Sequence, residues 1–140
     1  MIKIYFYISL FFLSLSSFAQ TAEELNKQSE SIINENPDEA LQLSKKAIDK
    51  AKTEKNKLQE GFGYLNLGTA LYYLDEYDNG VIEIKKGLAI AIETNDKNLE
   101  GKCECIIGEI YVYTAEYEKS LEHLSKARNI FEENNKKKEE

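Results

Sequence analysis

The chain has 140 residues, of which 42% are hydrophobic and 31% are charged, and its formal net charge is −7. One proline, two cysteines and one histidine exclude a disulfide scaffold and leave little for a metal cluster or a histidine-based catalytic triad. The acidic balance argues against a nucleic-acid partner, because binding to phosphates needs a basic surface.

The first nineteen residues differ from all that follow. Lys3 is their only charge, an apolar stretch with two serines runs from Ile4 to Leu15, and the small residues Ser17 and Ala19 close the segment. This order is typical of a secretory signal peptide. The alternative is a membrane anchor, but 4–19 is shorter than the ~20 residues of a spanning helix. We predict a signal peptide over 1–19, cleavage after Ala19, and an exported protein, periplasmic or secreted, with no membrane span in its mature part.

From residue 20 onward the chain repeats itself at an offset of forty residues. Gly61 returns as Gly101, and Gly68 returns as Gly108. The other recurring positions are small (Ala40, Gly80, Ser120 and Ala47, Gly87, Ala127) or apolar (Leu41, Val81, Leu121 and Ile32, Tyr72, Val112). Fixed periods of this length indicate stacked-repeat architectures. We expect a repeat domain over 20–140, with units at about 21–59, 60–99 and 100–138.

Each unit is predicted to form two helices. In the middle unit, apolar residues recur at i, i+3 and i+4 over 61–74, which predicts the first helix. The second is predicted over 79–94, where charged residues lie outside an apolar stripe. A turn is expected at 75–78 and a break at 95–98. The predicted fold is therefore all-α, a solenoid of three stacked helical hairpins.

Small residues that recur in register predict close helix crossings. Glycine inside a helix costs ~1 kcal/mol relative to alanine, so its repetition suggests a packing reason. We expect crossings at Gly68 and Gly108 in the first helices, against Ala40, Gly80 and Ser120 in the second helices.

These residues resemble the tetratricopeptide repeat, a family of antiparallel helix pairs. The middle unit carries the pattern as Tyr64, Leu67-Gly68, Leu71, Tyr77, Gly80 and Ile84, and the third as Ile107-Gly108, Tyr111, Tyr117, Ser120 and Leu124. The first unit departs from it, with Gln28 in place of the glycine, Pro37 in place of the tyrosine and Ser44 in place of the large residue.

The period is forty residues, against ~34 in the usual family. We expect the additional length in the second helix and its loop, as in longer variants from bacterial signalling proteins, which the chain resembles. The Ala19-Gln20 junction resembles signal peptides common in Bacteroidetes.

The sequence offers no arrangement of residues for catalysis. Cys103 and Cys105 are two apart on a predicted helix and point in different directions, which predicts reduced, partly buried thiols. His123 is expected in solvent, without a catalytic or metal role. We therefore predict no enzyme activity and no cofactor.

The resemblance implies a concave groove that is lined by the first helices and receives a peptide. Its positions here are Leu65, Asn66, Thr69, Tyr72 and Tyr73 in the middle unit, and Cys105, Glu109, Val112 and Tyr113 in the third. Tyr64, Tyr77, Tyr111 and Tyr117 are expected in the core between repeats. For Tyr72, Tyr73 and Tyr113 both the groove and the core remain open.

The family's carboxylate clamp is not expected here. The clamp uses lysine and asparagine in the groove, and among Leu65, Asn66, Thr69, Lys102 and Ile106 only Asn66 and Lys102 are compatible with it.

Two roles follow from these observations. The first is a protein–protein interaction module, an exported scaffold that binds a partner polypeptide in its groove. The alternative is the periplasmic sensor segment of a longer membrane-bound signalling regulator of the histidine kinase or DNA-binding type.

Overall fold

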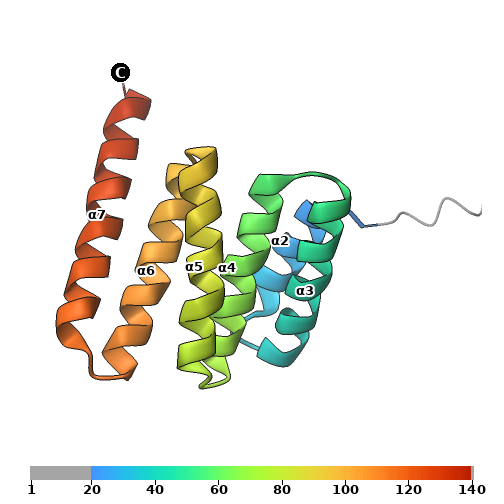
Figure 1. Ribbon diagram of the computed structural model, residues 1–140, viewed down its shortest axis with the longest axis horizontal. Helices are drawn as coiled ribbons and strands as arrows, with labels where there is room; N and C mark the ends of the chain where they lie inside the picture. Colours follow the sequence, from blue (N-terminus) through green and yellow to red (C-terminus); the bar gives the residue numbers. More distant parts are fainter. Residues whose placement is uncertain (1–19, 140) are drawn as a thin grey trace, which may run out of the picture.

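The computed structural model describes residues 20–139 of the chain, so the predicted signal peptide lies outside the described residues. Within them it contains six helices and no strand: α2 (Ala22–Ile32), α3 (Pro37–Thr53), α4 (Lys57–Tyr73), α5 (Tyr77–Thr94), α6 (Lys97–Tyr113) and α7 (Tyr117–Glu139). Consecutive helices form three antiparallel hairpins that stand side by side (Figure 1). The predicted all-α stack of three hairpins is confirmed for this part of the chain.

Helices begin earlier than the sequence pattern indicates. α4 starts four residues and α5 two residues before the predicted boundaries. Side chains of Asn56 and Asp96 accept hydrogen bonds from the backbone N–H groups of Gln59 and Leu99, which caps α4 and α6. Only Asn95 and Asp96 separate α5 from α6. The additional length of the repeat thus lies in the helices, and the expectation of a longer loop was wrong.

Four loop residues have left-handed backbone conformations and recur every twenty positions. They are Lys55, Asp75, Asn95 and Ala115, with φ between 53° and 62°. In each case the N–H of the next residue donates to the carbonyl five positions earlier, as from Glu76 to Leu71 at 2.9 Å. This is the Schellman end of a helix, which satisfies carbonyl groups that the last turn leaves free. Helix and loop together therefore span twenty residues.

The glycines predicted at helix crossings lie at helix crossings. A methyl group at Gly68 would stand 2.4 Å from Cγ1 of Ile84 and 2.7 Å from the backbone oxygen of Gly80. At Gly108 it would stand 2.7 Å from Cγ of Leu124. These distances are far below van der Waals contact, so only glycine permits the observed approach of the two helices in each hairpin.

In the first hairpin a serine occupies the crossing. Ser29 is fully buried, and its hydroxyl lies 2.9 Å from the carbonyl oxygen of Ala40 and 2.8 Å from the hydroxyl of Ser44. Ala40 and Ser44 stand forty residues before Gly80 and Ile84, so Ser29 takes the place of Gly68. The prediction that Gln28 replaces the glycine was therefore wrong by one residue.

The first hairpin's turn explains this shift. The N–H of Asn36, which caps α3, donates to Ile32, whereas Glu76 at the corresponding position donates to Leu71. The first turn contains no left-handed residue. The hydrogen bond that closes the first turn spans four residues, whereas the one that closes the second turn spans five. Positions in α2 therefore correspond to positions thirty-nine residues later in α4, instead of forty.

Candidate partner-binding groove

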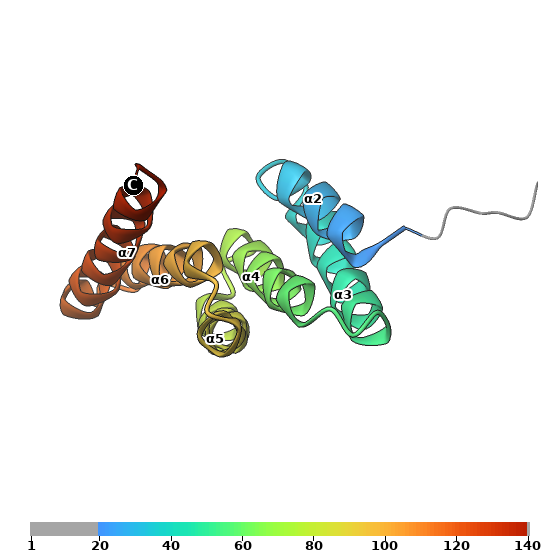
Figure 2. The same ribbon diagram turned by 90° about the horizontal axis from the view of Figure 1, so that it is seen from above.

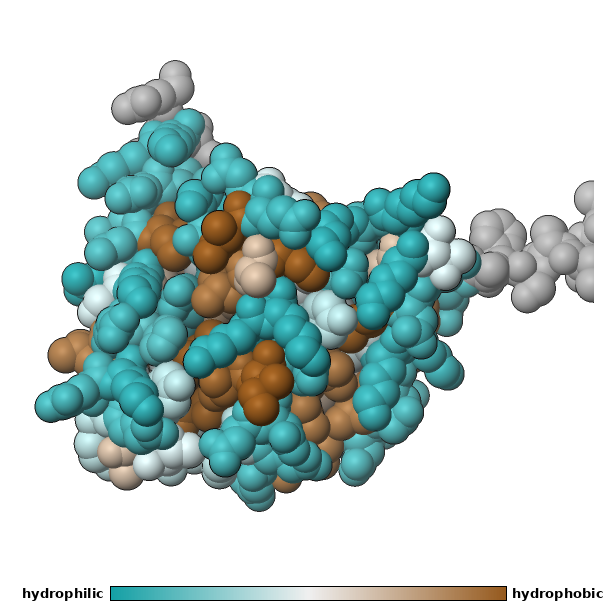
Figure 3. Space-filling model, viewed as in Figure 1, coloured by the Kyte–Doolittle hydropathy of each residue, from teal (hydrophilic) through white to brown (hydrophobic). Residues whose placement is uncertain are grey.

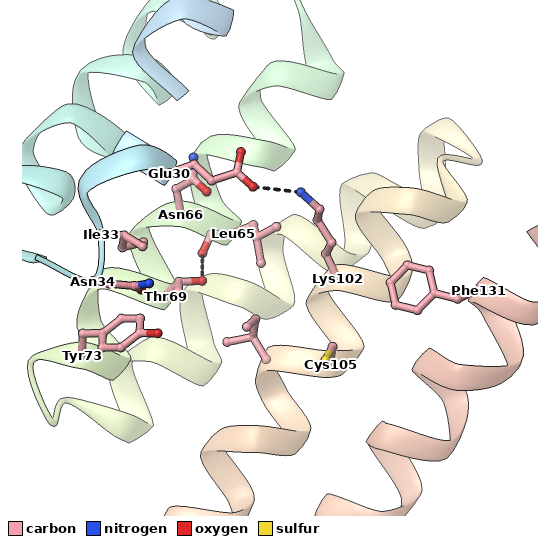
Figure 4. Close-up of a pocket in the computed structure, with 11 residues that line it drawn as sticks. Glu30, Ile33, Asn34, Leu65, Asn66, Thr69, Tyr73, Lys102, Cys105 and Phe131 are labelled. Carbon is pink, nitrogen blue, oxygen red and sulfur yellow. Dashed lines mark hydrogen bonds and ion pairs between the residues drawn. The ribbon is translucent and has the colours of Figure 1, made fainter. Parts of the chain in front are cut away.

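The first helices of the second and third hairpins, α4 and α6, form the floor of a groove. Seen from above, α4 and α6 lie between α2 on one side and the C-terminal part of α7 on the other (Figure 2). A cavity of about 360 Å³ opens here. Its lining comes from α2 and the following turn (Glu30, Ile33, Asn34), α4 (Leu65, Asn66, Thr69, Tyr73), α6 (Lys102, Cys105, Ile106) and α7 (Phe131) (Figure 4).

Five of the nine predicted groove residues line this cavity. They are Leu65, Asn66, Thr69, Tyr73 and Cys105. The other four, Tyr72, Glu109, Val112 and Tyr113, lie in the last turns of α4 and α6, toward the hairpin turns. All nine predicted groove residues therefore lie on α4 and α6, the two helices that the offset of forty residues relates to each other.

Leu65 and Asn66 offer little surface to a partner. Leu65 is 5% and Asn66 is 6% exposed. The amide nitrogen of Asn66 donates to the carbonyl oxygen of Asn26 at 3.0 Å, and the amide nitrogen of Asn26 donates to that of Gln59 at 2.9 Å. These two side chains join α2 to α4, so they stabilise the wall of the groove.

An ion pair crosses the cavity from α2 to α6. Nζ of Lys102 lies 2.9 Å from a carboxylate oxygen of Glu30, seventy-two residues earlier in the chain (Figure 4). Both side chains are partly exposed, so the pair adds little stability. It engages the ammonium group that a carboxylate clamp would need.

Sequence reasoning missed the contribution of α2 and α7 to the cavity. Glu30, Ile33 and Asn34 belong to the unit that fits the repeat least well. Phe131 lies against Gly101, where an added methyl group would stand 2.6 Å from its ring. The sequence offered one signal for the contribution of Phe131. Gly61 recurs as Gly101, and a recurring glycine in a helix indicates that a large side chain of a neighbouring helix packs against it.

Four tyrosines gather beside the cavity, at the hairpin-turn end of the groove. We call Tyr72, Tyr73, Tyr77 and Tyr113 the tyrosine cluster. The ring centroid of Tyr72 lies 5.0 Å from that of Tyr73, 6.1 Å from that of Tyr77 and 5.3 Å from that of Tyr113. Tyr73 is 45% and Tyr113 is 64% exposed. These two rings are therefore available to a partner, and Tyr72 supports them from between.

The central ring of the cluster remains neutral over a wide pH range. Burial raises the pKa of Tyr72 far above its ordinary value, and the neighbouring Tyr113 side chain and the negative charge of Glu109 raise it further. Hydrogen bonding to Asp75 raises the pKa of Tyr77 as well. The cluster thus presents uncharged aromatic rings next to two carboxylates.

Two further side chains lie elsewhere than predicted. Tyr117 is 67% exposed and not in the core, because no further hairpin covers α7 in the part of the chain that the structure describes. His123 is not in solvent: its Nδ1 lies 2.5 Å from a carboxylate oxygen of Glu104, and its ring lies 5.5 Å from that of Tyr111. His123 thus joins α7 to α6.

The two cysteines are free thiols, as predicted. Cys103 is fully buried between α5 and α6, and burial raises its pKa to about 12. Cys105 is half-buried in the groove, where its Sγ lies 3.6 Å from a carboxylate oxygen of Glu109. Burial and the charge of Glu109 also raise the pKa of Cys105. Both groups are protonated at neutral pH, so neither is an activated nucleophile.

The outer face of the molecule, on the side of α3 and α5, also carries apolar residues. Figure 3 shows apolar residues over the middle of the outer face, among hydrophilic ones. Ile82 and Ile92 of α5 are among the exposed apolar side chains. Within residues 20–139, no helix is long and apolar enough to cross a membrane. Among the side chains of residues 20–137, no group of His, Cys, Asp and Glu could hold a metal ion.

Comparison with known proteins supports the architecture. No protein-family model matches the sequence, and no curated protein matches it significantly. Among solved structures, the chain is similar to the TPR domain of Arabidopsis FLU, with a TM-score of 0.71 and 19% identity over 79% of this chain and 94% of that one. It is also similar to aspartyl phosphate phosphatase F from Bacillus subtilis, with a TM-score of 0.75 and 22% identity over 81% of this chain and 30% of that one. The fold is thus that of tetratricopeptide repeats.

Proposed function

We propose that the protein is an exported, non-catalytic scaffold that binds an extended segment of a partner polypeptide in the groove over α4 and α6. The observation that carries this proposal is the cavity of about 360 Å³ with exposed tyrosines beside it. Concave sites with a largely apolar lining and a few polar groups are typical of ligand binding, and tyrosine is common at recognition hot spots.

The chemistry of the groove favours binding over catalysis. Its thiol, Cys105, is protonated, and its lysine, Lys102, is paired with Glu30. The single histidine is engaged with Glu104 between α6 and α7. A partner segment would instead find an apolar hollow, polar atoms of Asn34 and Thr69 at its side, and aromatic rings at its end.

Filling the cavity tests the proposal. The probe is a phage-displayed library of random dodecapeptides, selected on the purified protein. We expect Thr69→Trp to weaken binding of the selected peptides at least tenfold, because the indole would occupy the cavity that Thr69 lines. The matched control is Ile82→Trp on the outer face of α5, where the side chain is already exposed; it should bind as the unmodified protein does.

Equal binding by a folded Thr69→Trp variant would contradict the groove as the binding site. Circular dichroism of both variants checks that they remain helical. Export rests on the pattern of residues 1–19 and is tested separately. The N-terminal sequence of protein recovered from the periplasm or medium should begin at Gln20, and protein found only in the cytoplasm would contradict it.

A further inference from the structure

Several aromatic rings of this chain carry a lysine ammonium group above them. Nζ of Lys86 lies 5.5 Å from the ring centroid of Tyr64, and Nζ of Lys119 lies 5.2 Å from that of Tyr111. Lys102 stands in the same way over Phe62, at 5.9 Å. The face of an aromatic ring is electron-rich and attracts cations. The tyrosine cluster differs, because no lysine or arginine of residues 20–137 stands over any of its four rings.

Carboxylates beside the cluster also lack a cation. Glu109 is half-buried next to Cys105, and its charge contributes to the raised pKa of Tyr72. Asp75 accepts a hydrogen bond from the hydroxyl of Tyr77 at 2.7 Å. Within the described part of the chain neither carboxylate forms an ion pair. The nearby ammonium group of the groove, on Lys102, is paired with Glu30.

The same end of the molecule carries more negative charge. A second, smaller hollow beside Tyr77 is lined by Asp75, Glu76 and Asp78. Tyr73 lines the cavity of the groove and also belongs to the cluster, so the apolar hollow and the electron-rich rings are continuous. A partner segment that enters the cavity therefore meets uncompensated negative potential next to it.

We infer that the tyrosine cluster and Glu109 bind a positively charged side chain, arginine or lysine, of the partner segment whose neighbouring apolar residue fills the cavity. This inference rests on the proposed function and specifies its partner. An arginine suits the site best, because its planar guanidinium stacks on tyrosine faces and still donates hydrogen bonds to a carboxylate. The carboxylates of Glu109 and Asp75 repel acidic segments, which gives the site its selectivity.

The experiment uses peptides from the same library whose binding is lost in Thr69→Trp. We expect arginine or lysine at one position of most of these peptides. For one such peptide, Glu109→Gln should weaken binding about tenfold, which corresponds to ~1.4 kcal/mol. The peptide with glutamine in place of its basic residue should bind Glu109→Gln and the unmodified protein equally. The matched control is Glu93→Gln, which removes an exposed carboxylate from the outer helix α5 and should change nothing.

Each outcome has one meaning. One contrary result is that the selected peptides lose binding in Thr69→Trp and yet contain no basic residue. Another is that they contain one and bind Glu109→Gln as tightly as the unmodified protein. Either result overturns this inference and leaves the proposed function standing. A library without any cavity-dependent peptide overturns both. Analytical ultracentrifugation of the protein alone tests whether a second copy of the chain occupies the groove. A dimer that dissociates in Glu109→Gln would also overturn the inference, because the cation would then come from this chain.

Discussion

The first and second hairpins solve one packing problem with different chemistry. In the second, Gly68 lets the backbones of α4 and α5 approach until nothing larger than a hydrogen fits between them. In the first, Ser29 and Ser44 fill the crossing and hydrogen-bond to each other and to Ala40. The glycine crossing depends on shape alone, whereas the serine crossing depends on satisfied polar groups. A large residue should therefore be worst in the second hairpin, and a lost hydroxyl should matter only in the first.

The largest effect is expected for Gly68→Leu. The added side chain would meet Ile84 and the backbone oxygen of Gly80, and a backbone atom cannot rotate away. Overpacking of this kind costs about 3 kcal/mol or more. The melting temperature, followed by circular dichroism, should fall by more than about 10 °C. The control is Lys85→Leu, which places the same side chain on an exposed position of α5. An unchanged transition in Gly68→Leu would show that the helices separate at little cost.

A smaller effect is expected for Ser29→Ala. The change removes the hydroxyl that links α2 to Ala40 of α3, and one buried hydrogen bond contributes about 1 kcal/mol. Urea denaturation should report a loss of that size. Ser31→Ala is the matched control on the same helix, because the hydroxyl of Ser31 is exposed and bonds only to the carbonyl oxygen of Gln28.

Ser44→Ala refines the comparison within the first hairpin. It keeps the bond from Ser29 to Ala40, which joins the two helices, and removes the contact between the hydroxyls together with the bond from Ser44 to Ala40 within α3. We expect a loss smaller than that of Ser29→Ala. The reverse order would mean that the bond from Ser44 to Ala40 within α3 contributes more to stability than the bond from Ser29 to Ala40 between the helices.

The sequence predicts the parts of this fold that repeat. An offset of forty residues identifies three hairpins, the crossings at Gly68 and Gly108, and the two helices that form the groove floor. Helix starts were misplaced because the polar first turns that follow the caps Asn56 and Asp96 resemble loops in sequence. The offset of α2 was misplaced because Ser29 and Ala40 are one position closer in the chain than Gly68 and Gly80, and composition does not reveal this difference.

The candidate site was only partly predictable for a related reason. Repetition places Thr69, Tyr73 and Cys105 on one surface, but it does not reveal contacts between residues far apart in the chain. The ion pair between Glu30 and Lys102 joins the first hairpin to the third. The contact between His123 and Glu104 likewise depends on the pairing of α7 with α6.

The even number of helices in the described part of the chain has a consequence for tethering. The start of α2 and the end of α7 lie at the same end of the molecule as the loops between hairpins (Figure 1). The hairpin turns lie at the opposite end, where Asp75 borders the tyrosine cluster. A surface or a larger body attached at either terminus would therefore hold the domain with this cluster pointing outward. Attachment and recognition would then occur at opposite poles and would not compete for space.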